Sequence, residues 1–292
     1  MACYISSIEG NRQKLDGGAM FGNAPKALWS QWIAADENNC VELACRAMLL
    51  ELENTKILFE TGIGAFFEPK LALRYGVQNS KEHVLLENLD ELGVSEEDID
   101  YVVLSHLHFD HAGGLLPKFD EIRKGKKYLH FPRAKYVLGS VAFERARRPH
   151  PRDKASYIPL LNELLEKSGR LQLVQEGTSA GLIEDHLSFI FSEGHTPGQM
   201  HSIIRGEHET IFFCGDLIPG VAWVHAPITM GYDRFPEKLI DEKHRFYAGD
   251  THRNILLFYT HDPVYCVSKF SKSENGKIKA VDKVERLERL VL

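Results

Sequence analysis

The ten residues SHLHFDHAGG, from Ser105 to Gly114, hold three histidines and one aspartate within six consecutive positions. They directly follow the apolar residues YVVL, which have the length and composition of a buried strand. His106 and His108 are two positions apart, so both side chains project from one face where the strand ends. Asp110 and His111 follow in a turn and can point toward a second centre nearby. The spacing predicts a metal site at the end of this strand.

The composition indicates a globular protein. The chain has 292 residues, of which 43% are hydrophobic, and this is enough to build a sizeable core. The net charge of −6 has the wrong sign for a protein that grips a phosphate backbone, so we expect no nucleic acid among its partners. The five cysteines are an odd number at irregular spacing, which argues against a disulfide framework and for a reducing compartment.

The N-terminus and the hydropathy pattern predict where the chain works. The opening residues MACYISSIEG lack the basic start and the apolar core of a secretory signal. No window reaches the roughly 18 uninterrupted apolar residues that a membrane span needs. We therefore expect a cytoplasmic protein that makes no contact with a membrane.

Strand patterns alternate with helical patterns along the chain. Five short apolar runs each end in polar residues: 56–62, 101–106, 187–195, 210–216 and 254–261. Helical patterns cover 81–92 and about 156–167, and a further helix begins near Pro236. Asn275-Gly276, between two strand-like runs, is a hairpin signal. The alternation predicts an α/β architecture.

The sequence contains no repeat, low-complexity segment or Pro/Gly/Ser linker that would divide it convincingly. We therefore expect a single domain over residues 1–292. Two segments, 19–35 and 221–235, are aromatic and apolar without clean periodicity. We expect them to be loops that cover a pocket, within the regions at about 1–50 and about 217–250.

Other strand ends supply further side chains that bind metals. They are His195 in EGHTPG, Asp216 in FFCGD and His261 in FYTHDP. Imidazoles bind zinc, iron or manganese, and a carboxylate between two metals can offer one oxygen to each. The alternative is that these are core histidines or surface polar groups that happen to end strands. Seven candidate ligands at metal spacing favour a binuclear site.

SHLHFDHAGG, with the downstream GHTPG, GD and strand-end histidine, resembles the metallo-β-lactamase superfamily over about Lys56 to His261. The resemblance implies a four-layer αββα sandwich with two mixed β-sheets and a dinuclear metal site at one edge. It implies these ligands: His106, His108 and His195 for one metal; Asp110, His111 and His261 for the other; and Asp216 as the bridge. We expect two divalent metal ions, zinc first, with manganese or iron as alternatives.

Metal chemistry then predicts the reaction. Two cations that bridge a water molecule lower its pKa from about 15.7 toward about 7, which provides hydroxide at neutral pH. Asp110 can both bind a metal and orient that hydroxide. Homoserine lactonases of the superfamily often carry a tyrosine three residues after the bridging aspartate, where this chain has Pro219. Tyr232 and His225 are our candidates for a proton donor or carbonyl clamp; the alternative is that they are ordinary loop residues.

One departure from the family pattern concerns the support of the metal histidines. Family members often have Asp in a D-T-G that closes the early strand, where this chain has Glu60-Thr61-Gly62. The question is then whether the longer side chain of Glu60 makes the hydrogen bond to a metal histidine.

The branch of the superfamily that fits the chain best hydrolyses a small ester or lactone, so we expect a small-molecule substrate. A homodimer is possible as well as a monomer. An apolar cleft suits such a substrate. Its candidate walls are Met20, Phe21, Trp29, Phe66, Phe67 and Trp223. The alternative is that these side chains fill the core or a subunit interface.

Two other functions remain open on the same ligands. The basic clusters 123–127 and 145–152 are typical of solvated faces, but if they flank the cleft they favour a phosphodiesterase or organophosphate hydrolase. A mononuclear iron enzyme similar to persulfide dioxygenases is the third reading. It would leave Asp110 and His261 unused as ligands.

Overall fold

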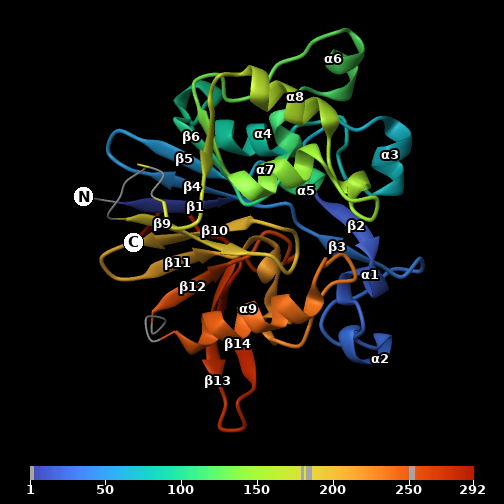
Figure 1. Ribbon diagram of the computed structural model, residues 1–292, viewed down its shortest axis with the longest axis vertical. Coiled ribbons are helices and arrows are strands. Elements are labelled where there is room, and N and C mark those ends of the chain that lie inside the picture. Colours follow the sequence, from blue (N-terminus) through green and yellow to red (C-terminus); the bar gives the residue numbers. More distant parts are fainter. Residues whose placement is uncertain (1–2, 179–180, 182–185, 250–253) are drawn as a thin grey trace.

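The computed structural model describes residues 3–178, 181, 186–249 and 254–292, and its strands form two large sheets (Figure 1). The first sheet has the spatial order β15 (Leu290–Val291), β1 (Tyr4–Ile8), β4 (Ala47–Glu51), β5 (Lys56–Phe59), β6 (Tyr101–Leu104), β7 (Lys135–Gly139), β8 (Leu171–Val174). The second has the order β14 (Ile278–Val284), β13 (Val267–Lys272), β12 (Ile255–Phe258), β11 (Thr210–Phe213), β10 (Gln199–Arg205), β9 (Leu187–Ser192). A small sheet pairs β2 (Gln13–Asp16) with β3 (Cys40–Leu43).

Both large sheets are mixed, as predicted. In the first, β5, β6, β7 and β8 pair in parallel, and the strands on the other side of β5 pair antiparallel. In the second, β11 and β12 pair in parallel, and the other neighbours pair antiparallel. Parallel neighbours end at the same edge of a sheet, so the residues that follow them are brought together.

Alternating side chains of the strands build two different cores. In β5, Ile57 and Phe59 face the second sheet, whereas Leu58 faces the outer helices. In β12, Leu256 packs between the sheets and Leu257 packs outward. Because both faces of these strands are buried, their sequences are continuous apolar runs without polar alternation.

Helices cover the outer face of each sheet. They are α1 (Gly17–Phe21), α2 (Lys26–Trp29), α3 (Pro69–Arg74), α4 (Val84–Glu91), α5 (Phe109–Ala112), α6 (Phe119–Arg123), α7 (Ser140–Arg147), α8 (Pro159–Lys167) and α9 (Pro236–Ala248). Buried residues of α4, α7 and α8 pack on the first sheet, and Leu239 of α9 packs on the second. Figure 1 shows these layers, with α9 on the opposite side from α4 and α8. The predicted αββα sandwich is confirmed.

The predicted elements correspond to observed ones. The five apolar runs contain β5, β6, β9, β11 and β12, and each strand ends before the polar residues that close its run. The helical patterns contain α4, α8 and α9, and α9 begins with Pro236 in its first turn. Gly93, just after α4, has a φ of 73°, a conformation that favours glycine. Asn275-Gly276 lies in the turn between β13 and β14.

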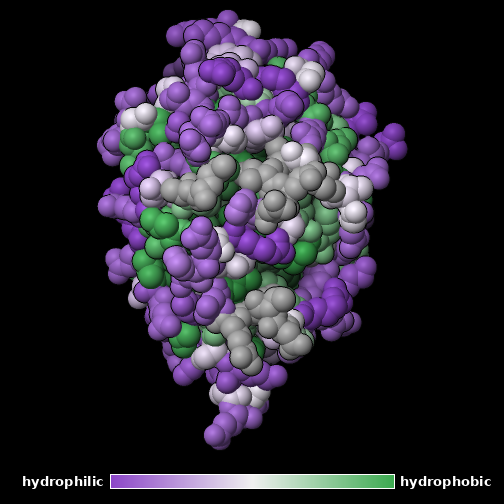
Figure 2. All heavy atoms as spheres, turned by 90° about the vertical axis from the view of Figure 1, so that its left-hand side faces the viewer, coloured by the Kyte–Doolittle hydropathy of each residue, from purple (hydrophilic) through white to green (hydrophobic). Residues whose placement is uncertain are grey.

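The helices in the described ranges are short. None of the helices there is long and apolar enough to cross a membrane. Figure 2 turns the side with both chain ends toward the viewer, and hydrophilic side chains predominate on it. Apolar side chains lie there in small separate groups between them.

A buried lysine of α9 holds the segment that runs from β11 to this helix. The Lys243 ammonium nitrogen donates to the carbonyl oxygens of Trp223 at 2.9 Å and Ile228 at 2.7 Å. The side chain is fully buried, and burial lowers the pKa of Lys243 to about 7. A neutral amine still has two N–H donors for the two carbonyls, so the contact survives loss of the proton.

We predict that Lys243 makes stability depend on pH above neutrality. Its pKa in the folded protein, about 7, lies below that of the unfolded chain, so between pH 7 and 9 the unfolded chain binds more protons. The free energy of unfolding should therefore rise with pH by up to about 1.4 kcal/mol per unit from this group. Denaturant titrations at several pH values should show the rise in the wild type and lack this component in Lys243→Met.

The matched control is Lys238→Met, which removes an exposed lysine of the same helix. Its unfolding free energy should follow the pH dependence of the wild type. If Lys243→Met also follows the wild type, Lys243 keeps its proton in the folded state and the prediction is wrong.

Candidate metal centre

The candidate ligands lie at one edge, where strands of both sheets end. β6 of the first sheet ends two residues before His106, and β9, β11 and β12 of the second end shortly before His195, Asp216 and His261. His108 precedes the first turn of α5, and that turn carries Asp110 and His111. The four strands thus bring together side chains that are far apart in the sequence.

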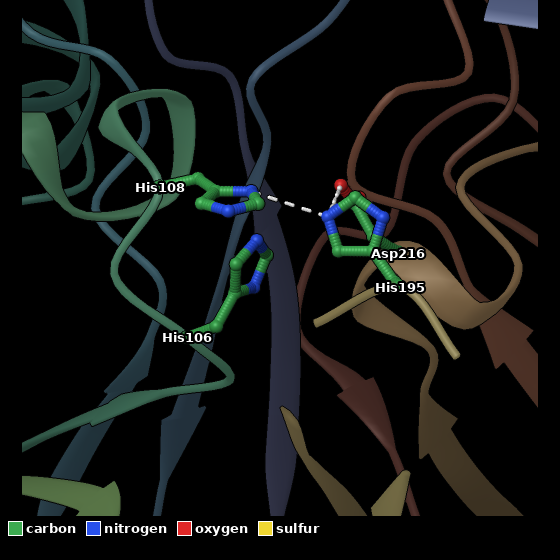
Figure 3. Close-up of side chains that lie close together, drawn as sticks. All are labelled: His106, His108, His195 and Asp216. Atoms are coloured by element: carbon green, nitrogen blue, oxygen red, sulfur yellow. Dashed lines mark hydrogen bonds and ion pairs between the residues drawn. The ribbon is translucent and has the colours of Figure 1, made fainter. Parts of the chain in front are cut away.

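The first group consists of His106, His108, His195 and Asp216, one ligand atom of each lying within 4.8 Å of the others. Figure 3 shows the rings of His108 and His195 pointing toward one another. His195 Nε2 is 3.1 Å from His108 Nδ1 and 3.1 Å from Asp216 Oδ2. All four side chains are buried.

The second group consists of Asp110, His111 and His261, again with ligand atoms within 4.8 Å of one another. The Nε2 atoms of the two histidines are 3.0 Å apart, and His261 Nε2 is 3.6 Å from Asp110 Oδ2. Asp216 reaches this group as well, because its Oδ1 is 3.3 Å from His111 Nε2 and 3.2 Å from His261 Nε2. One Asp216 oxygen therefore faces each group.

The residues present fit a pair of divalent cations. His106 Nε2 and Asp216 Oδ1 are buried, and neither has a hydrogen-bond partner among the described residues. A buried polar atom without a partner is costly, and several such atoms that converge indicate a bound ion. Neutral imidazole and carboxylate are the donors that zinc and similar metals take. The seven residues are those that the sequence singled out.

The pKa values of the candidate histidine ligands shift in different directions. Burial, together with neighbouring histidines, lowers the pKa of His106 and His108 well below the usual value, which keeps them neutral as a metal ligand must be. Burial acts in the same direction on His111, but the charges of Asp216 and Glu60 outweigh it and raise its pKa. Burial would raise the pKa of Asp216, but the surrounding histidines lower it well below its usual value.

Outer hydrogen bonds orient the histidine rings. His195 Nδ1 is 2.9 Å from Asp233 Oδ1, and His261 Nδ1 is 2.7 Å from the carbonyl oxygen of Ala44. Such contacts fix the tautomer and turn the other ring nitrogen toward a metal. Neither Asp233 nor Ala44 was found from the sequence, because nothing local links them to the histidines that they contact.

Glu60 contacts both the end of β6 and the ring of His111. Its Oε1 accepts from the backbone N–H of Ser105 at 2.9 Å, which ties the end of β5 to the end of β6. Its Oε2 is 3.7 Å from His111 Nδ1, an ion-pair distance and too long for a hydrogen bond. Glu60 therefore supports His111 by charge and the strand end by a hydrogen bond.

Gln13 is a further contact that the sequence did not reveal. Its amide Nε2 donates to Asp110 Oδ2 at 2.7 Å, and its side chain is fully buried. Gln13 lies on β2, nearly a hundred residues before Asp110, so no sequence spacing indicates the pair. The contact fixes the carboxylate of Asp110 relative to the rest of the site.

The glycines that end the motif allow a close approach of two loops. A Cβ on Gly114 would lie 2.1 Å from the carbonyl oxygen of Thr61, so only glycine fits there. Gly113 has a φ of −61°, which any residue adopts, and a Cβ there would lie 2.5 Å from the carbonyl oxygen of Ile63. These glycines serve backbone packing behind His111.

A pocket of about 210 Å³ opens beside both groups. Candidate ligands line it together with the apolar side chains of Met20, Tyr75 and Met230. Tyr232 also lines this pocket, and partial burial raises its pKa to about 12. Both regions expected to cover a pocket contribute lining residues, although much of each region forms strands and helices.

The structure corrects the placement of His225. It lines a separate hollow with Lys277 and Tyr265, away from the pocket that holds the candidate ligands. The cause is the short turn at 221–224, whose Trp223 and Val224 side chains are buried and so direct His225 to the other side. His225 is not a candidate catalytic residue.

Most of the candidate pocket walls are core residues instead. Phe21 stacks between Trp29 and Trp223, with ring centroids 5.3 Å and 4.6 Å apart, in the core outside the second sheet. Phe66 and Phe67 pack with the core outside the first sheet. Of the six, Met20 lines the pocket. The five aromatic side chains are core residues: Phe21, Trp29 and Trp223 stack in one core, and Phe66 and Phe67 pack tilted to each other at the other.

One basic cluster flanks the pocket and the other does not. Arg152, from the cluster 145–152, lines the pocket, and so does Arg234, which the sequence did not single out. Arg145 lies behind them and pairs with Asp153, a buried residue of the same lining. In the cluster 123–127, Lys126 pairs with Glu121 on an exposed surface.

Comparison with known sequences shows the family. A model described as metallo-beta-lactamase superfamily matches residues 41–248. A probable metallo-hydrolase of Mycobacterium tuberculosis is 24% identical over 270 residues, which cover 84% of this chain and 82% of that protein. An N-acyl homoserine lactonase of a Bacillus species is 25% identical over 180 residues, 57% of this chain and 60% of that protein. A Thermus thermophilus ribonuclease is 30% identical over 149 residues, 51% of this chain, and the match spans 32% of its length.

Solved structures show the same fold over almost the whole chain. A probable metal-dependent hydrolase from Staphylococcus aureus has a TM-score of 0.85 at 25% identity and covers 99% of this chain and 98% of its own. A dizinc quorum-quenching lactonase has a TM-score of 0.73 at 20% identity, covering 96% and 94%. With the family model over residues 41–248 and the histidine and aspartate cluster in place, the chain belongs to the metallo-beta-lactamase superfamily and is a metallo-hydrolase of that superfamily.

Proposed function

We propose that this metallo-hydrolase uses two divalent metal ions, zinc first, to cleave a small ester or lactone. The observation that carries the proposal is the position of Asp216, whose two oxygens face the two histidine groups. Asp216 would help to hold two divalent ions, together with the histidines of the two groups. A mononuclear iron enzyme would leave Asp110 and His261 without a role, although they lie beside His111 at ligand spacing.

The residues of the pocket have different proposed roles in the reaction. When bound, two divalent cations lower the pKa of a water molecule between them and polarise a carbonyl oxygen. Asp110, held by Gln13, can accept a proton from the attacking water and keep the water oriented. The apolar lining contributed by Met20 and Met230 excludes solvent and suits an acyl chain or a lactone ring.

Tyr232 is the proposed proton donor. Its hydroxyl is protonated at neutral pH, and burial raises its pKa further, to about 12. It lines the pocket with Asp110, so it can donate a hydrogen bond to the oxygen that gains negative charge. In sequence it lies 16 positions after Asp216, whereas Pro219, the family's usual tyrosine position, offers no hydroxyl.

Relatives support the choice of substrate. A sequence relative is named an N-acyl homoserine lactonase, and a structural neighbour is described as a dizinc lactonase with a hydrolysed product bound. The identities of 25% and 20% leave the substrate a proposal. A phosphoester is the second candidate, favoured by Arg152 and Arg234 in the pocket lining.

Two metal ions per chain is the first prediction from this site. Elemental analysis of the purified wild type should give two zinc or manganese ions per chain. His108→Ala and His261→Ala should each give about one, because each removes a ligand from a different group. Hydrolysis of a lactone panel should fall by roughly a thousandfold or more in both variants, since ligands of one site act as a unit.

The control for these variants is His208→Ala, which changes an exposed histidine in the turn between β10 and β11. It should keep two ions and full turnover. Circular dichroism should show the same fold in all variants. A single iron per wild-type chain, with neither the lactone panel nor a phosphotriester panel hydrolysed, would contradict the proposal.

Tyr232→Phe tests the proton donor. It should lower kcat by about tenfold to a hundredfold and leave KM within about threefold, because the hydroxyl acts on charge that develops in the transition state. Steady-state kinetics on the best lactone measure both constants. Tyr128→Phe, which removes a hydroxyl bonded to Glu121 beside α6, is the matched control and should have wild-type kinetics. An unchanged kcat in Tyr232→Phe removes Tyr232 from the mechanism.

A further inference from the structure

The guanidinium of Arg234 has hydrogen-bond donors that no described residue of the protein fills. Its side chain is only 11% exposed, and Nε and Nη1 are buried without a hydrogen-bond partner in the described ranges. A guanidinium carries a full positive charge and five donors, so leaving donors unfilled away from water is costly. Arg234 also lines the pocket beside the candidate metal ligands. A group inside the pocket can fill these donors.

One oxygen of the neighbouring carboxylate is already in use, whereas the other, Asp153 Oδ1, is buried without a hydrogen-bond partner among the described residues. Asp153 Oδ2 accepts from Arg145 twice, from Nη2 at 2.6 Å and from Nε at 3.0 Å. Arg234 Nε lies 3.8 Å from the same oxygen, which is within ion-pair distance but beyond a hydrogen bond. Arg145 thus holds Asp153 Oδ2, and neither Nε nor Nη1 of Arg234 donates to this carboxylate.

A second arginine adds positive charge to this wall of the pocket. Arg152 also lines the pocket and donates through Nη2 to the carbonyl oxygen of Gly231 at 2.8 Å. The guanidinium groups of Arg145, Arg152 and Arg234 therefore lie near one another, and Asp153 is the carboxylate that Arg145 and Arg234 face. A positive wall inside a partly apolar cleft attracts an anion and disfavours a cation.

The backbone holds Arg234 in register with the candidate metal centre. The preceding residue, Asp233, contacts His195 Nδ1 through Oδ1 and accepts the backbone N–H of Met230 through Oδ2. The backbone N–H of Arg234 donates to the carbonyl oxygen of His195 at 3.1 Å. Two consecutive residues thus contact His195 and one wall of the pocket, and the backbone of Arg234 is held beside this histidine.

We propose that Arg234 binds an oxyanion of the substrate, a carboxylate or a phosphate, and that the enzyme selects anionic esters over neutral ones. This inference rests on the proposed hydrolase function and adds the class of substrate to it. The planar guanidinium matches both oxyanions, and two parallel hydrogen bonds fix the orientation of the group that it holds. The substrate is then anchored at one end by Arg234 while its ester or lactone bond lies toward the histidines.

The test compares matched esters on the metal-loaded enzyme. The neutral ester is 4-nitrophenyl butyrate, and the anionic ester is the mono-4-nitrophenyl ester of succinic acid, which is close to it in length. Wild type should prefer the anionic ester in kcat/KM. Arg234→Gln should raise KM for the anionic ester by about tenfold to a hundredfold, with kcat/KM for the neutral ester unchanged. Arg234→Lys should restore part of the loss, because it keeps the charge but not the planar fork.

The matched control is Arg148→Gln, which removes the same charge from an exposed arginine outside this pocket. It should leave the ratio of the two kcat/KM values as in the wild type. Thermal unfolding and metal content of each variant check that fold and ions are retained. If Arg234→Gln affects both esters equally, or neither, the inference is overturned.

A binding measurement separates this inference from the hydrolase proposal and the two oxyanions from each other. Titration calorimetry with succinate and with inorganic phosphate should show weaker binding of one or both to Arg234→Gln than to wild type. A loss confined to succinate assigns a carboxylate, and a loss confined to phosphate assigns a phosphate. If wild type hydrolyses neither ester, the hydrolase proposal loses support while the calorimetry still decides on Arg234. Equal binding by wild type and variant overturns the inference.

Discussion

The rest of the site depends on the contacts between the buried carboxylate of Asp216 and three histidines. The carboxylate is surrounded by their three imidazoles, with His195 on one oxygen and His111 and His261 on the other. A carboxylate in such a place requires compensating positive charge. The histidines supply part of it, and their ring nitrogens together with the carboxylate are a ligand set for cations. The same contacts therefore stabilise the protein and define its chemistry.

The packing of the two sheets brings Asp216 and the histidines together. Asp216 follows β11 of the second sheet, and His111 lies after β6 of the first, so the two sheets must meet at this edge. The core between the sheets sets how they pack, and the close approach of Gly114 to Thr61 sets the loops behind the histidines. Because these parts are closely packed, side chains from four strand ends are held within 4.8 Å of one another in each group.

The pocket is divided between two kinds of surface. The metal side and the arginine side are both polar, and apolar residues such as Met20 and Met230 lie in the same lining. Such a combination orients a substrate that has a reactive bond, a nonpolar body and a charged end. Asp233 and Arg234 connect the two sides, since the first orients His195 and the second faces the cleft. The proposed substrate anchor and the candidate metal ligand His195 are thus linked through two adjacent residues.

The sequence by itself determined the strands, the α/β class and the seven candidate ligands from local patterns, and the αββα sandwich was what the family resemblance implied. Apolar runs predict strands, and SHLHFDHAGG carries four ligands within six positions. The tertiary structure alone decided which distant residues support them. Gln13, Asp233 and Arg234 reach the site through packing between elements, and nothing in their own neighbourhood indicates it. It also placed His225 and the five aromatic side chains expected as pocket walls outside the pocket lining. The reason is that a residue's distance from a site depends on how the chain folds back and not on its position in the chain.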